Sequence, residues 1–246
     1  MTTKRAIILS AGQGKRLLPL TEARPKCLVE LGGRSLLAWQ LTHLQAAGVE
    51  EVVVVTGFGA SLVEDEIGRL KLGAMAVSTV YNPFYGVADN LASCWIVRDR
   101  FEAGVLLLNG DTLFEPAIAD RLIAAPMTDI VVTVDRKPTY DADDMKVETR
   151  GDDLFAIGKT IQTYDAESIG FLRFSDRGAA RFRSAMEAAL RDPDNLRRWY
   201  LSIIHELARQ GGGVSVCSIE GLGWGEMDFL ADVATNEALV QGWLAR

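Results

Sequence analysis

The sequence predicts an α/β protein with a doubly wound, mostly parallel central sheet and helices on both faces. Continuous apolar runs rich in β-branched residues recur through the first half of the chain, with helical patterns between them. A turn with two glycines follows the first of these runs directly. Because ligands of such folds bind at the carboxyl ends of the strands, the fold class also predicts where a site should lie.

The expected strands of the first half are short and apolar. Arg5 to Leu9 reads as a buried strand that leads into the glycine turn. Four further runs have the same character: 51–56, 75–81, 105–109 and 130–134. Apolar residues at consecutive positions indicate strands that are covered on both faces, as in a parallel sheet.

Two helices are expected between these strands. Ser35 is a suitable N-cap for a helix that places Leu37, Leu41 and Leu44 on one face, and Gly48 should end it. The second helix should follow Asp89 and run to residue 97.

The alternation changes after about residue 135. The expected elements there are a hairpin of strands 144–148 and 153–157 around Gly151-Asp152, strands at 168–174 and 214–219, and helices at 176–190, 198–210 and 229–244. No linker, repeat or low-complexity run divides the chain, so we expect one domain over residues 1–246. Residues 1–135 would form its core, and residues 136–246 an elaboration with a closing helix.

Composition excludes several classes of function. The formal net charge of −7 argues against nucleic-acid binding, which needs a basic face. Three cysteines without C-x-x-C spacing favour a reducing, cytoplasmic setting and no structural zinc. No run approaches the roughly 18 apolar residues of a membrane span.

The glycine turn is the first candidate binding element. It reads Ser10-Ala11-Gly12-Gln13-Gly14-Lys15-Arg16. Glycines let backbone amides approach an anion and form a nest for phosphate oxygens. Arg16 after Lys15 excludes a Walker A loop, and Leu17 excludes the dinucleotide fingerprint. Taken alone, the turn fits a plain strand-to-helix connection equally well.

The residues after the turn decide between these readings. Pro19-Leu20-Thr21 and then Pro25-Lys26-x-Leu28-Val29 complete a pattern that resembles the signature of the nucleotidyltransferases that make activated sugars and alcohols. This resemblance implies the nucleotide-diphospho-sugar transferase fold, a GT-A-like variant of the Rossmann fold, and a nucleoside triphosphate as substrate. Lys15 and Arg16 would hold the triphosphate and Lys26 the α-phosphate; the alternative is that they are solvated surface cations.

Two acidic elements suit a metal ion. Asp111 follows an apolar strand in Asn109-Gly110-Asp111, and Glu226 and Asp228 are two residues apart near the C-terminus. Asp111 also fits an ordinary turn, and Asp228 an N-cap of the last helix. All three match metal-binding positions of the family that the chain resembles, which implies a Mg²⁺ site at Asp111, Glu226 and Asp228.

A narrower resemblance concerns the base. Asn90-Leu91-Ala92-Ser93 resembles the Asn-x-x-Ser segment of the small cytidylyltransferases that activate phosphocholine or inositol phosphate. It implies CTP as the nucleotide. The expected catalytic residues, from the N-terminal signature and the acidic element after the apolar strand, are Arg16, Lys26 and Asp111. The expected nucleotide-binding residues are Ser10, Ala11, Gly12, Gly14, Lys15, Arg16, Lys26, Asn90 and Ser93.

The acceptor site is expected in the second half of the chain. Lys146 and Lys159 resemble the paired lysines that meet the acceptor phosphate in the inositol-phosphate relatives, and Glu167 lies in a segment similar to one that lines their acceptor site. The acceptor would be phosphocholine, a phosphonate, or a polyol or sugar phosphate. Strand lysines that discourage edge pairing are the alternative for the two lysines.

Three other functions share features with this sequence. A sugar-1-phosphate uridylyl- or guanylyltransferase shares the N-terminal signature, and a non-catalytic nucleotide-sensing subunit shares the fold. Retention of Arg16, Lys26, Asp111 and Asp228 together favours an enzyme. A GT-A glycosyltransferase would normally carry Asp-x-Asp where this chain has Asn109-Gly110-Asp111. The sequence specifies neither the oligomeric state nor the pathway.

Overall fold

The computed structural model describes residues 5–102 and 104–245. They form two compact units that interleave in the sequence. The terminal unit holds residues 5–86, 108–120 and 222–245, and the middle unit holds residues 87–107 and 121–221. These borders do not coincide with the expected division near residue 135, because the C-terminal segment packs on N-terminal elements. The single domain stays a prediction.

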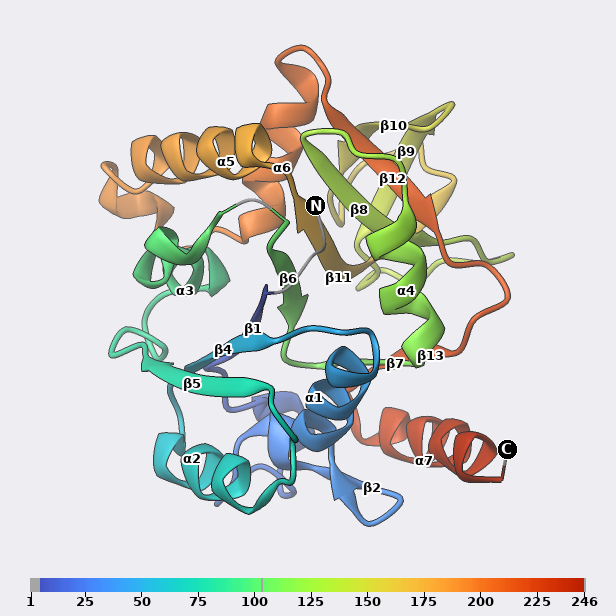
Figure 1. Cartoon of the computed structure of the whole chain (residues 1–246). Coiled ribbons are helices and arrows are strands. Elements are labelled where there is room, and N and C mark those ends of the chain that lie inside the picture. Colours follow the sequence, from blue (N-terminus) through green and yellow to red (C-terminus); the bar gives the residue numbers. More distant parts are fainter. Residues whose placement is uncertain (1–4, 103, 246) are drawn as a thin grey trace. The chain divides into compact units, whose positions relative to one another are not determined.

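A parallel sheet forms the centre of the terminal unit. It has the order β5-β4-β1, with β1 (Arg5–Ser10), β4 (Glu51–Thr56) and β5 (Ala76–Tyr81). All pairs are parallel and in continuous register, from Arg5 opposite Glu51 to Thr56 opposite Tyr81. Figure 1 shows the three strands side by side. The expected parallel pairing is confirmed in this unit.

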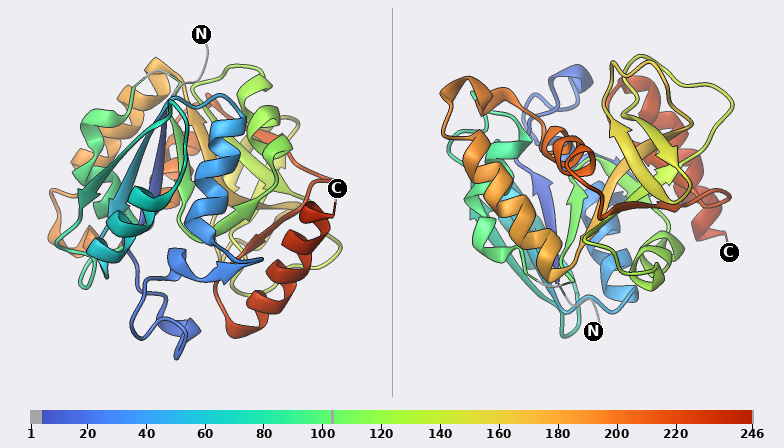
Figure 2. Two further views of the ribbon diagram at one scale, coloured as in Figure 1. Left: turned by 60° about the horizontal axis from the view of Figure 1, so that its bottom comes forward. Right: turned by 90° about the horizontal axis from the view of Figure 1, so that it is seen from above.

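Two helices lie on the same face of this sheet (Figure 2). They are α1 (Leu36–Ala46) and α2 (Ala60–Arg69). The Ser35 side chain accepts a hydrogen bond from the amide of Ala38 at 3.1 Å, which confirms the predicted cap. Helix α2 was not expected from the sequence; Val63 is its one buried residue, and its other apolar positions are partly or fully exposed.

Small elements complete the terminal unit. They are the 3₁₀ turns η1 (Lys15–Leu17) and η2 (Lys26–Leu28), the hairpin β2 (Glu30–Leu31) and β3 (Arg34–Ser35), the pair β7 (Thr112–Phe114) and β13 (Trp224–Glu226), and α7 (Leu230–Leu244). A buried cluster that includes Leu17, Leu113 and Met227 joins them. Each of these three lies one or two residues from a predicted site residue, so the cluster gathers those segments.

The chain passes between the units within β6 (Leu106–Asn109) and within α4 (Pro116–Ala124). The sequence analysis missed α4, although proline at its first position is a common helix start.

The middle unit has strands in the order β11-β8-β12-β10-β9. They are β8 (Ile130–Asp135), β9 (Lys146–Arg150), β10 (Asp153–Ile157), β11 (Ala166–Phe174) and β12 (Val214–Ser218). Only β12 and β8 pair in parallel; the other pairs are antiparallel. The expectation of a mostly parallel sheet is therefore wrong for this unit. The hairpin expected around Gly151-Asp152 is confirmed: β9 and β10 are joined by a tight turn with Gly151 at φ +63°, and so short a connection permits only an antiparallel pair.

Helices α3 (Asn90–Ile96), α5 (Asp176–Ala189) and α6 (Tyr200–Arg209), with the 3₁₀ turns η3 (Arg98–Arg100) and η4 (Pro193–Arg197), complete the middle unit. Figure 2 shows α5 beside α6, and α6 packs on β10. The doubly wound order of a whole sheet stays a prediction. In the part of the chain that the structure describes, no helix has the length and apolar character needed to cross a membrane.

Candidate active site

The glycine turn leaves the end of β1 and closes on Lys26. Gly14 has φ +80°, and a Cβ on it would lie 2.8 Å from the Cβ of Lys26. The amide of Lys26 donates to the carbonyl of Gln13 at 3.1 Å, and the Thr21 hydroxyl donates to the carbonyl of Gly14 at 2.7 Å. The stem of Lys26 therefore packs directly on the turn, because position 14 has no side chain.

The turn also presents open backbone donors. The amides of Gly12, Gln13 and Gly14 donate to no acceptor among the residues that the structure describes. Successive free N–H groups on a glycine-rich turn form a ready site for anionic oxygens.

Lys26 bridges two carboxylates. Its Nζ lies 2.6 Å from Oδ2 of Asp111 and 2.7 Å from Oδ1 of Asp228. Burial alone would lower the pKa of Lys26, but the two carboxylates outweigh burial and raise it above its usual value. The ammonium is therefore fully charged at neutral pH, and a solvated surface lysine is excluded at this position.

Asp111 is held by the turn between β6 and β7. A Cβ on Gly110 would lie 2.4 Å from the carbonyl oxygen of Leu9, so only glycine lets this turn pass the end of β1. Nε2 of Gln40, on α1, donates to the carbonyls of Asn109 and Thr112, both at 2.8 Å. The second carboxylate oxygen of Asp111, Oδ1, is buried without a hydrogen-bond partner.

Asp228 connects Lys26 with Arg16. Nη2 of Arg16 lies 2.7 Å from Oδ2 of Asp228, and the guanidinium lies 4.7 Å from the centre of the Phe229 ring. The N-cap of α7 is Phe229, so the alternative role of Asp228 as N-cap is wrong: its carboxylate binds the two cations instead. We call Arg16, Lys26, Asp111 and Asp228 the charged quartet.

Glu226 lies on β13, opposite Thr112 of β7. Among residues 5–102 and 104–245, no group of three His, Cys, Asp or Glu side chains is arranged to hold a metal ion. The role of Glu226 as a metal ligand stays a prediction.

The proposed base-reading segment lies in the middle unit, at the start of α3. Oδ1 of Asn90 accepts a hydrogen bond from the amide of Tyr200 at 2.9 Å. Because an amide can donate only to the oxygen, the side-chain NH₂ of Asn90 is the end that remains to bind a ligand. Ser93 is buried on the same helix.

The predicted acceptor residues are neighbours in the middle unit. Glu167 of β11 lies opposite Lys146 of β9, and Nζ of Lys146 donates to the carbonyls of Asp141 and Lys159. Lys146 is only 6% exposed, so the edge-protecting alternative is wrong for it. Its ammonium links the loop that contains Asp141 to the loop that contains Lys159.

Lys159 and Glu167 have charged partners. Nζ of Lys159 lies 3.3 Å from Oδ1 of Asp143 and 5.0 Å from the centre of the Trp199 ring. Burial raises the pKa of Glu167 to about 7, opposed in part by Lys137, whose Nζ lies 2.8 Å away. Lys137 was not predicted as a site residue. The one sequence feature that points to it is a positive charge just after the end of a strand.

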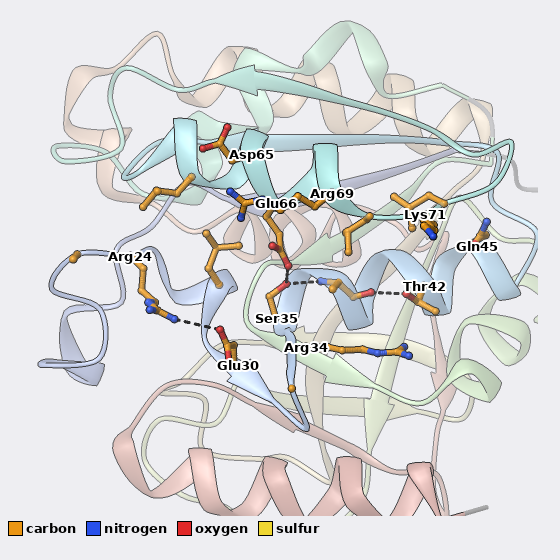
Figure 3. Close-up of a pocket in the computed structure, with 17 residues that line it drawn as sticks. Arg24, Glu30, Arg34, Ser35, Thr42, Gln45, Asp65, Glu66, Arg69 and Lys71 are labelled. Carbon is orange, nitrogen blue, oxygen red and sulfur yellow. Dashed lines mark hydrogen bonds and ion pairs between the residues drawn. The ribbon is translucent and has the colours of Figure 1, made fainter.

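A cavity of about 810 Å³ also lies in the terminal unit, between α1 and α2 (Figure 3). Its charged lining residues are of both signs, among them Arg34, Arg69 and Lys71 with Asp65 and Glu66. None of the residues that line it is a member of the charged quartet. The cavity is thus separate from the charged quartet.

Known proteins resemble this chain over most of its length. The family model of the MobA-like NTP transferase domain matches residues 6–207. The CMP-5'-(3-aminopropyl)phosphonate synthase of Streptomyces rubellomurinus is 42% identical over 122 residues, which are 50% of this chain and 19% of that protein. The bifunctional IPC transferase and DIPP synthase of Rubrobacter xylanophilus is 29% identical over 246 residues, which are 98% of this chain and 52% of that protein. The chain thus spans about half of the second relative and less of the first.

A solved structure has the same fold. The inositol-1-phosphate CTP transferase from T. maritima superposes with a TM-score of 0.83 at 22% identity, covering 98% of this chain and 96% of that one. This likeness confirms the mixed α/β fold. The family match includes the glycine turn, Lys26 and Asp111. The residues of the sequence signature are therefore the same residues whose contacts are described above. The chain belongs to the family of MobA-like NTP transferase domains.

Proposed function

We propose that the protein is a Mg²⁺-dependent nucleotidyltransferase that moves CMP from CTP to a small phosphorylated acceptor. A phosphate oxygen of the acceptor would attack the α-phosphorus, and the bond from that phosphorus to the β-phosphate would break to release pyrophosphate. The observation that carries the proposal is the position of Lys26, packed on a turn with open amides and bridging two carboxylates. The family and the activities named for the relatives support it.

The chain's own cations would do most of the chemistry. The free amides of the glycine turn and Lys15 would bind the β- and γ-phosphates. Lys26 would bind the α-phosphate, where negative charge increases in the transition state. Arg16, which is half exposed next to Asp228, would contact the triphosphate from the solvent side. Positioning and charge neutralisation account for most catalysis in reactions of this kind.

The donor set fits a magnesium ion. Oδ1 of Asp111 is a buried carboxylate oxygen without a hydrogen-bond partner, and such an oxygen is costly unless something binds it. Mg²⁺ is usually held by one or two carboxylates, with waters and substrate phosphates completing its shell, so Asp111 and Asp228 suffice. When bound, the ion would neutralise phosphate charge. Glu226 remains a proposed further ligand.

The state of Asn90 supports cytosine. Its NH₂ offers only donors, because the Tyr200 amide holds its oxygen. Cytosine has an unprotonated N3, which accepts a hydrogen bond, whereas N3 of uracil carries a hydrogen. A donor at this position therefore favours CTP over UTP.

The acceptor class follows from the middle unit. Lys159, whose ammonium lies over Trp199, would meet the acceptor phosphate. Lys146 would position that site through the two carbonyls that it binds. Glu167, paired with Lys137, would face the alcohol or ammonium end of a phosphocholine, phosphonate or polyol phosphate.

We also propose a cytoplasmic protein, since all three cysteines are buried free thiols.

Pyrophosphate release tests the proposal. Purified protein would be screened with CTP, UTP, GTP and dTTP against a panel of phosphorylated acceptors, in Mg²⁺ and in chelator. We expect turnover with CTP that needs both acceptor and Mg²⁺. Asp111→Asn should lose it, and Glu22→Gln, which removes an exposed charge, should keep it. Turnover with UTP or GTP alone would refute the choice of base. No turnover with any pair would favour a nucleotide-sensing subunit.

A further inference from the structure

We propose that Lys26 is an internal competitor of the metal ion. In the nucleotide-free protein its ammonium occupies the carboxylate oxygens that would bind Mg²⁺, and a nucleotide phosphate draws it away. The metal would then bind weakly until a phosphate is present. The identity of the phosphate ligand rests on the proposed function; the competition itself rests on the geometry.

The contacts of the charged quartet carry the inference. Cations bind three of its four carboxylate oxygens: Lys26 binds one oxygen of each aspartate at 2.6 and 2.7 Å, and Arg16 binds the second oxygen of Asp228 at 2.7 Å. The fourth oxygen, Oδ1 of Asp111, is buried without a hydrogen-bond partner. A divalent ion that enters this set must therefore displace an ammonium or lie beside it.

Charge makes either course unfavourable without an anion. The two cations and two carboxylates of the charged quartet sum to zero, so a divalent ion would bring an excess of two positive charges next to Lys26, or of one if Glu226 also binds the ion. Such repulsion is strong at a few ångströms in a partly buried site. A phosphate monoester supplies the missing negative charge, because the Lys26 ammonium can turn toward it and free the carboxylate oxygens.

The lysine is built so that only its end needs to move. The Cβ, Cγ and Cδ of Lys26 all lie within 3.3 Å of the position that a Cβ on Gly14 would take, so the stem packs against the turn. The stem lies against Gly14, whose amide is one of the turn's free donors. The same segment thus anchors the stem and offers the phosphate site that would attract the ammonium. Linkage then requires that metal and phosphate strengthen each other's binding by the same factor.

The test measures metal binding without turnover. Mn²⁺, as a paramagnetic substitute for Mg²⁺, would be titrated into nucleotide-free protein, and free Mn²⁺ would be read by electron paramagnetic resonance. We expect Lys26→Met to bind Mn²⁺ at least about tenfold more tightly than the wild type, within the usual range of such couplings. The matched control is Arg5→Met, which also removes one cation from a carboxylate partner, Glu51, at 2.9 Å. It should change the affinity less than twofold.

A second arm can be read on the wild type even if Lys26→Met fails to fold. Each of four ribonucleoside monophosphates, which bind metal ions weakly by themselves, would be added before the titration. At least one should tighten Mn²⁺ binding about fivefold or more in the wild type, and none should do so in Lys26→Met.

Equal Mn²⁺ affinity in both proteins, or no effect of any monophosphate on the wild type, would overturn the inference. These outcomes are distinct from failure of the proposed function. A wild type with nucleotidyl transfer but unchanged Mn²⁺ binding in Lys26→Met would refute only the competition. A protein without turnover that shows both effects would refute only the function.

Discussion

The carboxamide of Asn90 has one end fixed and one end open. The Tyr200 amide donates to its oxygen at 2.9 Å, and its NH₂ is the end that would bind the base in the proposed function. A substitution can therefore replace the NH₂ of this side chain and keep the oxygen that accepts the hydrogen bond from Tyr200. Aspartate at this position can accept the same Tyr200 hydrogen bond but presents an acceptor in place of the donor.

We therefore predict that Asn90→Asp lowers the preference for CTP over UTP. An unmade buried hydrogen bond costs about 1–3 kcal/mol, so the ratio of kcat/KM for the two nucleotides should fall about tenfold or more. Steady-state kinetics with both nucleotides measures it. The exposed Gln162→Glu, also in the middle unit, makes the same change of charge and should leave the ratio unchanged. An unchanged ratio in Asn90→Asp would remove Asn90 from base recognition.

The sequence motifs identified the quartet's members one by one, and the structure brings them together. Lys26, Asp111 and Asp228 were each predicted from a local pattern, and each proves to contact another member. That one ammonium would bind both carboxylates could not be predicted, because the three residues are up to 202 positions apart and no periodicity relates them. Lys137 was missed for the same reason: its partners Asp144 and Glu167 come from other segments.

The glycine turn is the element on which the quartet depends. Gly14 combines φ +80° with the closest approach to Lys26, whereas a Cβ on Gly12 would meet nothing within 4 Å. The two glycines thus differ in purpose. Gly14 is required by the packing of the lysine stem, and Gly12 only leaves room for a ligand.

Gly14→Ala should therefore destabilise the protein, and Gly12→Ala should not. A left-handed backbone costs a residue with a Cβ about 1–2 kcal/mol, and the contact with Lys26 adds to that cost. We expect a loss of at least about 1 kcal/mol in the free energy of unfolding for Gly14→Ala, and a change within about 0.5 kcal/mol for Gly12→Ala. Denaturant unfolding measures both. Equal stabilities would mean that the turn rearranges freely around position 14.

Elements with a strong pattern were predictable, and elements that pair only in three dimensions were not. The valine run of β4 and the cap of α1 were read directly from sequence. The pair β7 and β13 could not be, since each strand has three residues and its partner lies about 110 positions away. That pair matters for the site, because β7 follows Asp111 and β13 precedes Asp228.

At the scale of the molecule, one buried carboxyl should make stability depend on pH. Burial raises the pKa of Glu167 from 4.5 to about 7. Between these values the folded protein holds a proton that the unfolded chain has released, so the free energy of unfolding falls as pH rises from about 4.5 to 7.

The matching prediction compares variants across that window. Glu167→Gln should lose part of the slope of unfolding free energy against pH, because its side chain does not titrate. Glu22→Gln, at an exposed position, should keep the wild-type slope. Chemical denaturation at several pH values between 4.5 and 7 measures it. A Glu167→Gln protein with the wild-type slope would show that another group titrates in this window.

Each of the two units is built from stretches that are far apart in the sequence. The terminal unit draws on three separated stretches of chain, and the charged quartet takes members from all three. The expected division near residue 135 was based on a change in the alternation of predicted strands and helices, and that alternation is a property of neighbouring residues in the sequence. Which stretches pack together is decided by the buried cluster around Leu17, Leu113 and Met227, and no local signal reports that.

Gln40 shows where inactivating mutations would arise outside the motifs. It belongs to α1, it is buried, and its NH₂ holds both carbonyls that flank the turn of Asp111. No phosphate, base or acceptor needs to contact it. If every position of the chain is substituted in turn, activity should therefore be lost on substitution of Gln40 as readily as on substitution of the charged quartet. A set of mutations chosen only from groups that could contact the substrates would not include Gln40.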